Sequence, residues 1–415
     1  MAAWESLRIN LDRLRSDIEA LSKIGRAPDG NLTRHAFSPS YEEARRWLKG
    51  RMTASGIAAR DDAAGNTIGR VGSGTSCVMS GSHIDTVPDG GPLDGAFGVL
   101  SALECARVIK ESGLNPPRGF EAVAFVDEEG HFVNCMGSKA MVGALEKDDV
   151  MTAKSPTGSV LTDFMTRAGF DPARATEAKR KKGEIAAYVE LHIEQGPVLE
   201  SIQRPIGVVE GIVGLIHSDI TFYGEPDHAG TTPMDLRKDA FTGACEFVYK
   251  ARRMALRRGT PRTRITYGIV RSKSQASNIV PYEIYLRQEI RDTDQALVNR
   301  LVKASYRLAE KVAADYRLTV KYEQASGIKA ALMAPHVQDT IDNAAKALGL
   351  ATHRMPSGAG HDAQVIARVA DAGMIFVPSE GGRSHRRDEW TDWTLLEQGA
   401  NVLLQSVLRL MHAPG

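Results

Sequence analysis

The side chains best suited to metal chemistry gather in five short segments of the sequence, each of which combines histidine with aspartate or glutamate. Most of these segments follow apolar, strand-like runs, so we expect them in loops at the ends of strands. Imidazole and carboxylate groups are the ligands that divalent metal ions take in hydrolytic sites. The pattern therefore predicts a metal-dependent hydrolytic site. In chain order the segments are SGSHIDTVPDGGPLDGAFGV, VDEEGH, ELHIEQG, SGAGHDAQ and GGRSHRRDEW.

A hydrolytic site for two ions needs imidazoles, terminal carboxylates, one carboxylate that bridges the ions, and a free acid to take a proton from the attacking water. His83 is a candidate ligand, and the carboxylate of Asp85 is placed two residues later to accept the other ring N–H. Asp94 is the candidate bridge. His192 and His385 complete the predicted set of imidazoles.

Glu128 and Glu129 are adjacent, so they cannot both point the same way on an extended segment. One is expected to bind metal while the other stays free as the general base. Taken singly, each residue also has an ordinary structural interpretation, because histidines among glycines and the DGG and DGA sequences are common in turns. Paired glutamates usually form a solvated face. The five segments together favour a metal site.

Other polar residues have simpler interpretations. The histidines without neighbouring acids are interpreted as surface residues, and no role is evident for His131. The basic run ARRMALRRGTPR is interpreted as the solvated end of a helix. These surface histidines are His35, His336, His353 and His412.

The elements that must position this chemistry divide the 415-residue chain into three parts. Residues 1–210 alternate strand, loop and helix, as expected for an α/β domain that binds ligands at the ends of a buried sheet. Residues 211–327 contain strands of alternating polarity and two long helices, the pattern of a small α+β sandwich. Residues 328–415 return to helix, strand and helix. We therefore predict one α/β catalytic domain that is interrupted by an inserted smaller domain.

Composition excludes several classes of protein. The 52 Lys and Arg against 51 Asp and Glu leave a net charge of +1, so no charge bias points to nucleic acid or an anionic membrane surface. Four scattered cysteines without a CxxC pair are typical of a reducing compartment, and we expect a cytoplasmic location. No apolar run reaches the roughly 18–20 residues of a membrane helix. The charged N-terminal stretch predicts an amphipathic helix and not a signal peptide.

Together these motifs resemble the amidase/hydantoinase–carbamoylase family, which includes N-carbamoyl-L-amino-acid hydrolases, allantoate and ureidoglycolate amidohydrolases and β-ureidopropionases. The resemblance runs from about Leu7 to Leu408. It implies a mixed-sheet catalytic domain of the dinuclear zinc-hydrolase type with an inserted α+β lid and dimerisation domain. Beyond the five segments, it is carried by YGEPDHAGTTPMDLRKDA, SNIVP, EIRDTD and MIFVPS.

The resemblance also implies a role for each residue of the metal site. Glu128 would be the general base and Glu129 a ligand, with Asp94 as the bridge. The cofactors would be two divalent ions per subunit, with zinc as the first choice and manganese, cobalt or nickel as alternatives that suit the same ligands. The implied metal ligands are His83, Asp94, Glu129, His192 and His385.

On the inserted domain, the resemblance implies that His228 stabilises the oxyanion of the tetrahedral intermediate. Arg291 would clamp the substrate carboxylate, although in EIRDTD it could equally form a cross-strand ion pair. Asn278 could equally be a turn residue. His217 occupies a position where relatives often carry glutamine. The residues implied to bind the substrate are Gln195, His217, Asn278, Arg291 and Gly360.

The predicted reaction is hydrolysis of a linear ureido or amide C–N bond, first of an N-carbamoyl-L-amino acid to the L-amino acid, CO2 and ammonia. The alternatives are an allantoate or ureidoglycolate amidohydrolase, an amidase of another N-acyl amino acid, and a metal-binding protein that has lost catalysis. The implied partners are a small carboxylate substrate and a second copy of the chain, joined through the inserted domain as a homodimer. Relatives often read GGISHSPxEWT where this chain has GGRSHRRDEW, so Arg383, Arg386 and Arg387 alter the charge on the substrate side.

Overall fold

The computed structural model describes residues 3–413, which form two compact units. Unit 1 contains the chain up to Glu210 and again from Leu332 onward, and unit 2 is the insertion Gly211–Ala331. The insertion ends at Ala331, beyond the predicted boundary at residue 327. None of the helices found between residues 3 and 413 is long and apolar enough to cross a membrane.

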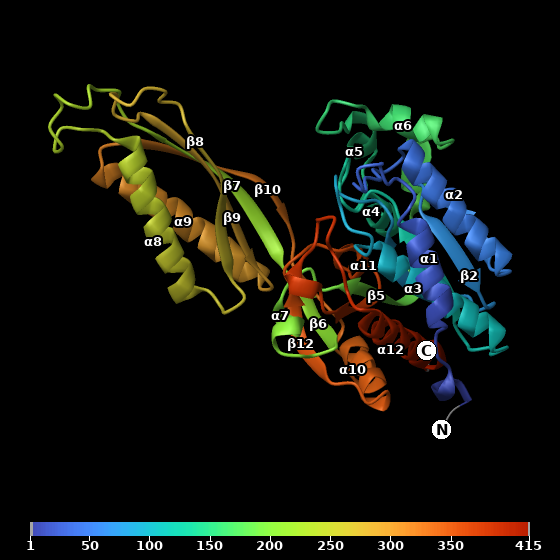
Figure 1. Ribbon diagram of the computed structural model, residues 1–415. Helices are drawn as coiled ribbons and strands as arrows, with labels where there is room; N and C mark the ends of the chain where they lie inside the picture. The colour runs from blue at the N-terminus through green and yellow to red at the C-terminus, as the bar shows by residue number, and fades with distance from the viewer. Residues whose placement is uncertain (1–2, 414–415) are drawn as a thin grey trace. The chain divides into compact units, whose positions relative to one another are not determined.

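Unit 1 is built on a mixed sheet of nine strands (Figure 1). They are β1 (Ala58–Asp61), β2 (Thr67–Val71), β3 (Cys77–His83), β4 (Gly119–Phe125), β5 (Ile185–Ile193), β6 (Ile206–Ile212), β11 (Ala331–Leu332), β12 (Thr352–Ser357) and β13 (Asp371–Val377). The order is β1-β2-β4-β3-β5-β13-β6-β11, and β12 pairs with β6. The four central strands β4, β3, β5 and β13 run parallel. Every residue of β3 and β4 is buried, as the apolar runs of a covered parallel sheet require.

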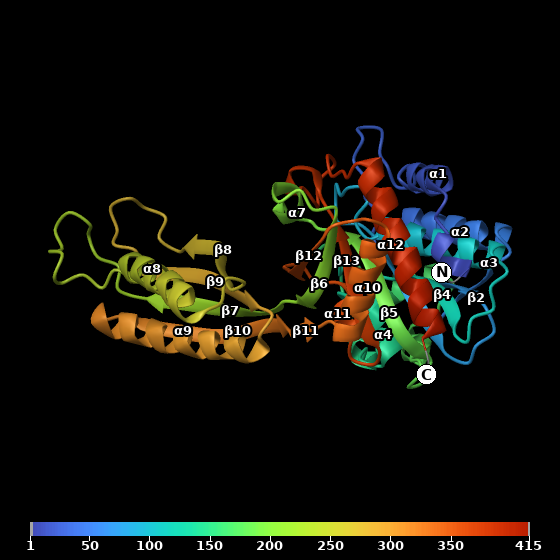
Figure 2. The same cartoon turned by 90° about the horizontal axis from the view of Figure 1, so that it is seen from below.

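Unit 1 also contains helices, several of which pack against this sheet (Figure 2). They are α1 (Leu11–Leu21), α2 (Pro39–Ala54), α3 (Ala96–Glu111), α4 (Met136–Val142), α5 (Lys147–Thr152), α6 (Leu161–Arg167), α7 (Val198–Ser201), α10 (Pro335–Ala347), α11 (Asp362–Ile366) and α12 (Trp393–His412). The helix α3 contacts β3, β4 and β5, and α12 contacts β5 and β13. Because α1 and α12 also cover α3, that helix is buried on nearly all sides. Three short 3₁₀ helices span Ala3–Ser6, Pro172–Ala178 and Glu380–Gly382.

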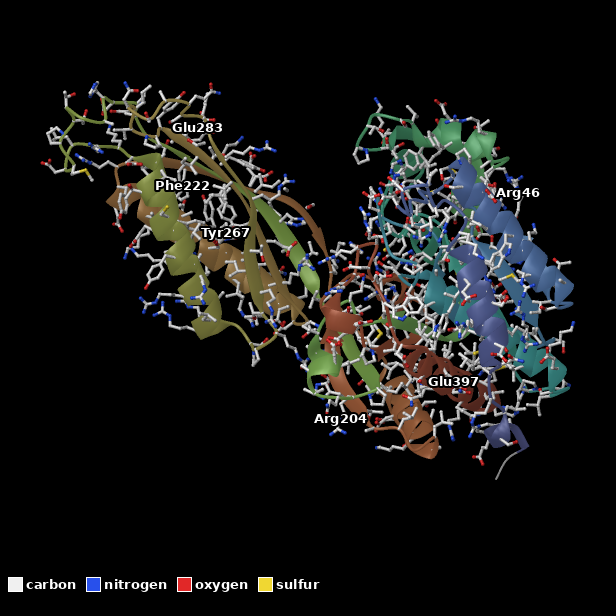
Figure 3. The ribbon with its side chains drawn as sticks, viewed as in Figure 1. Arg46, Arg204, Phe222, Tyr267, Glu283 and Glu397 are labelled. Atoms are coloured by element: carbon white, nitrogen blue, oxygen red, sulfur yellow. The ribbon has the colours of Figure 1, made fainter. Side chains whose placement is uncertain are left out.

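Unit 2 is a four-stranded antiparallel sheet with two long helices. Its elements are β7 (Gly214–Tyr223), α8 (Ala240–Arg258), β8 (Arg264–Ser272), β9 (Glu283–Asp292), α9 (Gln295–Asp315) and β10 (Thr319–Ile328), and the sheet order is β10-β7-β9-β8. Alternate residues of β9 are buried, because both helices pack on one face of the sheet. Phe222 and Tyr267, which Figure 3 labels, pack against Phe247 of α8 in tilted and edge-on orientations, at ring-centroid distances of 5.6 and 6.0 Å. The mixed sheet with an α+β insertion is the fold class that the sequence predicts.

Candidate metal centre

The ends of the parallel strands position most of the predicted site. Because β3, β4, β5 and β13 run parallel, their carboxyl ends meet at one edge of the sheet. His83 is the last residue of β3, and His192 is the last but one of β5, where it pairs in register with Phe376. Glu128 and Glu129 follow β4 by a few residues. The fold therefore brings four side chains from three separate motifs to one place.

Asp94 lies at the centre of this group, in the loop that joins β3 to α3. Its Oδ1 atom is 3.1 Å from His192 Nε2 and 3.7 Å from His83 Nε2. Its Oδ2 atom is 3.1 Å from His385 Nε2, which is in turn 3.5 Å from Glu129 Oε1. One carboxylate thus presents one oxygen to each of two sets of ligands.

The two buried imidazoles are oriented by the backbone. His83 Nδ1 is 2.9 Å from the carbonyl oxygen of Asp85, and His192 Nδ1 is 2.8 Å from that of Ile193. A carbonyl oxygen can only accept, so each Nδ1 carries the proton and donates it. In the neutral imidazoles, both Nε2 lone pairs therefore point toward the Asp94 carboxylate. That arrangement is repulsive unless a cation or a proton lies between them.

A glycine makes the close approach of His83 possible. Gly95 has φ +63°, and a Cβ atom there would lie 2.4 Å from Cδ2 and Nε2 of the His83 ring. Any larger residue would push the imidazole away from the turn that carries Asp94. The Gly95 N–H also donates to Nε2 of His192, at 3.2 Å. This turn therefore fits around both imidazoles.

The carboxylates of the centre are crowded and short of positive partners. Burial raises the pKa of Glu129 to about 7 and that of Glu128 well above its ordinary value. The Oε1 atom of Glu129 is buried without a hydrogen-bond partner. Burial would also raise the pKa of Asp94, but the facing imidazoles of His192 and His385, when protonated, hold it well below its ordinary value. The hydrogen bond to Asp94 raises the pKa of His385 to about 9.

These residues fit divalent metal ions. Within residues 3–413, four groups of three residues each offer one donor atom per residue within 4.8 Å of the others, and Asp94 belongs to two of them. The directed Nε2 lone pairs, the unpartnered Glu129 oxygen and the raised carboxyl pKa values all indicate positive charge at this place. The two groups with Asp94 are His83, Asp94 and His192, and Asp94, Glu129 and His385; the other two are His83, Glu128 and Glu129, and Glu190, His192 and His361.

The predicted role of Asp85 is wrong in one respect. Its backbone carbonyl, and not its carboxylate, accepts the hydrogen bond of His83, and the carboxylate Oδ1 is 3.8 Å from that ring nitrogen. The carboxylate instead accepts the backbone N–H groups of Glu128 at 3.4 Å and Glu129 at 3.1 Å. Asp85 therefore fixes the loop that carries both glutamates.

Glu389 supports Asp94 and was not identified from the sequence. Its Oε1 atom accepts the backbone N–H groups of Leu93 at 3.1 Å and Asp94 at 3.0 Å, and its Oε2 accepts the Ser384 hydroxyl at 2.8 Å. The side chain is buried, and burial raises its pKa to about 7. In the sequence it is the Glu of the EW pair that this chain shares with the GGISHSPxEWT pattern of relatives, four residues after His385.

The remaining predicted residues of unit 1 surround the centre. Gln195 donates from Nε2 to Asp94 Oδ2 and to the Ser384 hydroxyl, each at 3.2 Å. Gly360 precedes His361, whose ring packs edge-on against His192 at 4.6 Å between centroids. Gln195 thus contacts the predicted bridging carboxylate directly.

The structure changes the interpretation of His35 and of the arginines beside His385. His35 is partly buried and stacks on His131 with ring centroids 4.1 Å apart. Arg383 and Arg386 both pair with Asp388, at 3.1 and 2.9 Å, so part of the added charge in this loop is neutralised locally.

The predicted residues of unit 2 form two separate groups. His228 and Asn278 are exposed on neighbouring loops, where the Asn278 carbonyl accepts the N–H of Ala229 at 2.9 Å. The Nδ1 atom of His228 accepts the N–H groups of Gly230 and Thr231, at 3.0 and 3.2 Å. Its ring is therefore oriented by its own turn, which leaves Nε2 for another contact.

The second group joins His217 of β7 to Arg291 of β9 through Glu289. His217 Nε2 is 2.9 Å from Glu289 Oε2, and Arg291 Nη2 donates to the same oxygen at 2.8 Å. Arg291 Nε also donates to Glu289 Oε1, so the guanidinium is held through two of its nitrogens. Glu289 was not identified from the sequence. Arg291 pairs along its own strand, and the cross-strand pair is His217 with Glu289.

Comparison with known proteins identifies the family. A model of the peptidase family M20/M25/M40 matches residues 79–409. The chain is 35% identical over 404 residues to the N-carbamoyl-L-amino acid amidohydrolase of Geobacillus stearothermophilus, with 96% of this chain and 98% of that protein covered. It is 36% identical over 400 residues to the allantoate amidohydrolase of Escherichia coli (strain K12), with 94% and 95% covered.

A solved structure agrees with these relatives. The hydantoinase/carbamoylase family amidase from Burkholderia multivorans superposes with a TM-score of 0.92 at 31% identity and covers 99% of this chain and 100% of that one. Fold and site thus define a hydrolase with a candidate divalent-metal centre. The chain belongs to the peptidase family M20/M25/M40, and its resemblance to the hydantoinase–carbamoylase amidases is confirmed. The predicted enzyme class, a hydrolase of C–N bonds in linear amides, is confirmed with it.

Proposed function

We propose that the protein hydrolyses N-carbamoyl-L-amino acids to L-amino acids, CO2 and ammonia with two divalent ions per subunit. The observation that carries the proposal is the geometry of Asp94, whose two carboxylate oxygens face separate groups of ligands while Glu128 lies beside them. When bound, the ions polarise the scissile carbonyl and acidify water. Zinc is the first choice, and manganese, cobalt and nickel suit the same ligands.

Glu128 is the general base in this proposal. Its carboxylate is buried, with Oε2 at 3.7 Å from His83 Nε2 and Oε1 at 3.7 Å from the Cys135 sulfur. Its backbone carbonyl accepts hydrogen bonds from Asn134 Nδ2 at 2.7 Å and Cys135 N at 3.1 Å. These bonds fix the backbone that carries the side chain. Burial raises the pKa of Glu128, which favours a group that accepts a proton from water and returns it to the departing nitrogen.

The inserted domain supplies the substrate contacts in this proposal. His228 has Nε2 available to donate to the oxyanion, because Nδ1 is already an acceptor of two backbone N–H groups. Arg291 clamps the substrate carboxylate, and Glu289 orients its guanidinium. In this proposal the remaining predicted residues, Gln195, His217, Asn278 and Gly360, also bind the substrate.

We also propose that two copies associate through unit 2. Phe241, Tyr249 and Leu256 of α8 are 50%, 57% and 69% exposed, and their spacing places them on one face of the helix. Val270, on the edge strand β8 beside α8, is 58% exposed. An exposed apolar surface that continues to an unpaired strand edge is typical of a self-association surface.

The second candidate is an allantoate or ureidoglycolate amidohydrolase. It is favoured by the relatives of those names, since the chain is 36% identical to the allantoate amidohydrolase of Escherichia coli and 33% identical to the ureidoglycolate hydrolase of Oryza sativa subsp. japonica. The chemistry would be the same on a different substrate. An amidase of another N-acyl amino acid differs in the acyl group alone.

One screen separates these candidates. The purified protein, loaded in turn with zinc, manganese, cobalt or nickel, is assayed for ammonia release from N-carbamoyl-L-amino acids, allantoate and ureidoglycolate. Release of amino acid from N-acyl amino acids is measured in parallel. We expect the highest kcat/KM on an N-carbamoyl-L-amino acid. Turnover of no substrate with any metal would instead support a metal-binding protein that has lost catalysis.

A further inference from the structure

Positive charge is concentrated in the inserted unit, and the metal chemistry does not use it. Residues 211–331 contain 20 Lys and Arg against 13 Asp and Glu, a net charge of +7, while the rest of the chain carries a net charge of −6. The overall charge of +1 conceals this separation. An uneven distribution of this size points to a surface that attracts anions.

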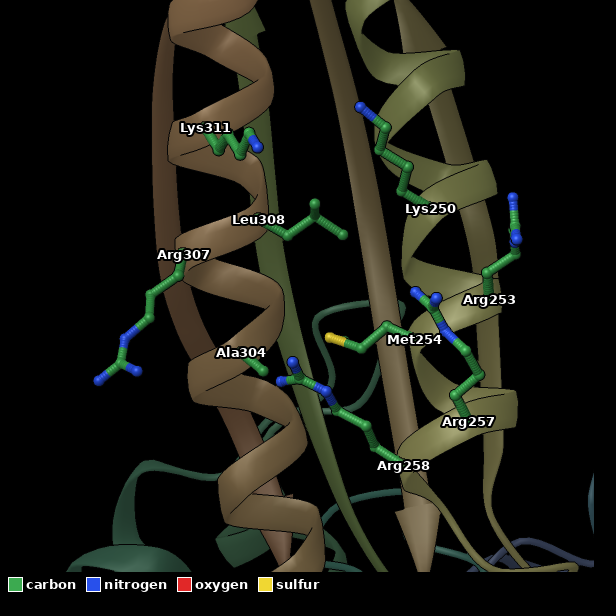
Figure 4. A pocket seen from close by; sticks show the side chains of 9 residues that line it. All are labelled: Lys250, Arg253, Met254, Arg257, Arg258, Ala304, Arg307, Leu308 and Lys311. Atoms are coloured by element: carbon green, nitrogen blue, oxygen red, sulfur yellow. The ribbon is translucent and has the colours of Figure 1, made fainter.

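Much of this charge lines a groove between α8 and α9 (Figure 4). The groove has a volume of about 520 Å³ and contains no acidic residue in its lining. Its apolar surface comes from Met254 on α8 and from Ala304 and Leu308 on α9. The cations of the lining are Lys250, Arg253, Arg257, Arg258, Arg307 and Lys311.

Most of these cations lack an acidic partner. Lys250 pairs with Glu246 at 2.8 Å, and Arg253 lies over the ring of Tyr249 at 5.7 Å. The side chains of the other four make no hydrogen bond or ion pair with any residue between 3 and 413. The spacing adds to the repulsion, because Arg307 and Lys311, like Arg253 and Arg257, stand four residues apart on one helix.

The positions of the groove cations along the two helices differ from those expected for basic residues that cap a helix C-terminus. Arg257 and Arg258 occupy the last turn of α8, where they interact favourably with the helix dipole, as the sequence interpretation supposes. Arg307 and Lys311 lie before the last turn of α9, which contains no basic residue. Their presence opposite the arginines of α8 is therefore not explained by capping.

Most of the groove faces away from the apolar surface of α8 that is assigned to self-association. At 100° per residue, the groove residues Lys250, Arg253 and Arg257 fall within about 60° of one another. Phe241 and Leu256 lie roughly 100° or more away from Arg257 on the same projection. The two surfaces meet at Arg253, which lies about 40° from Tyr249 on this projection and over its ring.

We propose that this groove binds a small anion that carries a chain of phosphates, either free or as part of a nucleotide. Arginine forks bind phosphate oxygens in a bidentate manner, and four unpaired cations match several charges better than a single carboxylate. The volume lies within the range of about 300–1,000 Å³ that small-molecule sites occupy. The apolar surface of Met254 and Leu308 could additionally receive a base.

Binding of inorganic tripolyphosphate, ATP and orthophosphate to the metal-loaded protein at 150 mM salt tests the proposal by calorimetry. The groove variant is Arg257→Gln/Arg307→Gln, which removes one cation from each helix. The matched control is Arg252→Gln/Lys303→Gln, which removes the same charge from the same helices outside this groove. Both variants keep the metal centre, so any binding of the probes to the metal ions is equal in the two.

We expect tripolyphosphate and ATP to bind and to raise the melting temperature, and orthophosphate to bind more weakly. The groove variant should lose roughly tenfold or more in affinity, and the control less than about threefold. Tighter binding of ATP than of tripolyphosphate would identify a nucleotide as the ligand. Equal binding of the two would identify a phosphate chain alone as the ligand. Equal loss in both variants, or binding only to a long RNA oligonucleotide, would overturn the proposal.

Discussion

The two units hold their candidate functional residues in different ways. In unit 1, His83, Asp94 and His192 are almost fully buried; backbone carbonyls hold the two imidazoles, and the Glu389 carboxylate holds the backbone of Asp94. In unit 2, His228 is exposed, and Arg291 is only partly buried and is oriented by the carboxylate of Glu289. Under the proposed function, the fold fixes the metal chemistry, and a few adaptable side chains determine the choice of substrate.

Among the tests of this comparison, removal of the metal should have the largest effect on activity. We expect a chelator to abolish activity and divalent ions to restore it, because the crowded carboxylates and directed imidazoles need positive charge. Metal analysis of Asp94→Asn should show loss of both ions, whereas His385→Ala should lose no more than one. Full activity in a metal-free preparation would contradict the proposed chemistry.

The next largest effect concerns Glu128 and Glu129, which are adjacent but have different proposed roles. Glu128→Gln should keep a nearly normal metal content while kcat falls by roughly 10²–10⁴, since the amide cannot accept the proton. Glu129→Gln should lose metal instead. The measurements are metal content and steady-state kinetics, and reversed results would mean that ligand and base are assigned the wrong way round.

A smaller effect on metal affinity is expected from Glu389, which contacts the backbone of the proposed ligand Asp94 and is not a ligand itself. Glu389→Ala removes the acceptor of the Leu93 and Asp94 N–H groups and should weaken metal affinity about 10–100-fold. Glu389→Gln should retain most of the affinity, because its amide oxygen can accept the same two bonds. If both variants weakened binding equally, the charge of Glu389 and not its hydrogen bonds would matter.

Sequence reasoning succeeded where residue type and position at a strand end were enough. Apolar runs that end in His83 or in Glu128 predict both the buried sheet and the edge at which ligands gather. Glu389 and Glu289 were missed because their roles depend on contacts with distant backbone or on a strand register that no local pattern contains. Asp85 was assigned the right partner but the wrong atom, since spacing cannot distinguish a carbonyl from a carboxylate.

In unit 2 the expected effect is on substrate binding. Arg291→Lys should raise KM for carboxylate substrates about tenfold or more, and barely change it for a neutral amide analogue, because lysine keeps the charge but loses the fork. Glu289→Gln should give a smaller rise in the same direction, since Arg291 remains but is less well oriented. Equal changes on both substrates would show that Arg291 is structural.

In a dimer, the insertion of one subunit contributes substrate-binding residues either to its own metal site or to that of its partner. The variants are Glu128→Ala, a defect in unit 1, and Arg291→Ala, a defect in unit 2, each nearly inactive as a homodimer. If the insertion serves the partner's site, one site of a mixed dimer carries both defects and the other carries none. Random pairing of equal amounts makes about half of the dimers mixed, so about a quarter of wild-type activity should return.

If the insertion serves its own subunit, every site in the mixture keeps one defect and no activity returns. Co-expression with two different tags, followed by sequential purification, isolates the mixed dimer and removes the need for subunits to exchange. In that pure mixed dimer about half of wild-type activity should appear, because one site in two is intact. An inactive mixed dimer would exclude a site shared between subunits while leaving the metal chemistry of unit 1 unchanged, which is the independence that the comparison of the two units implies.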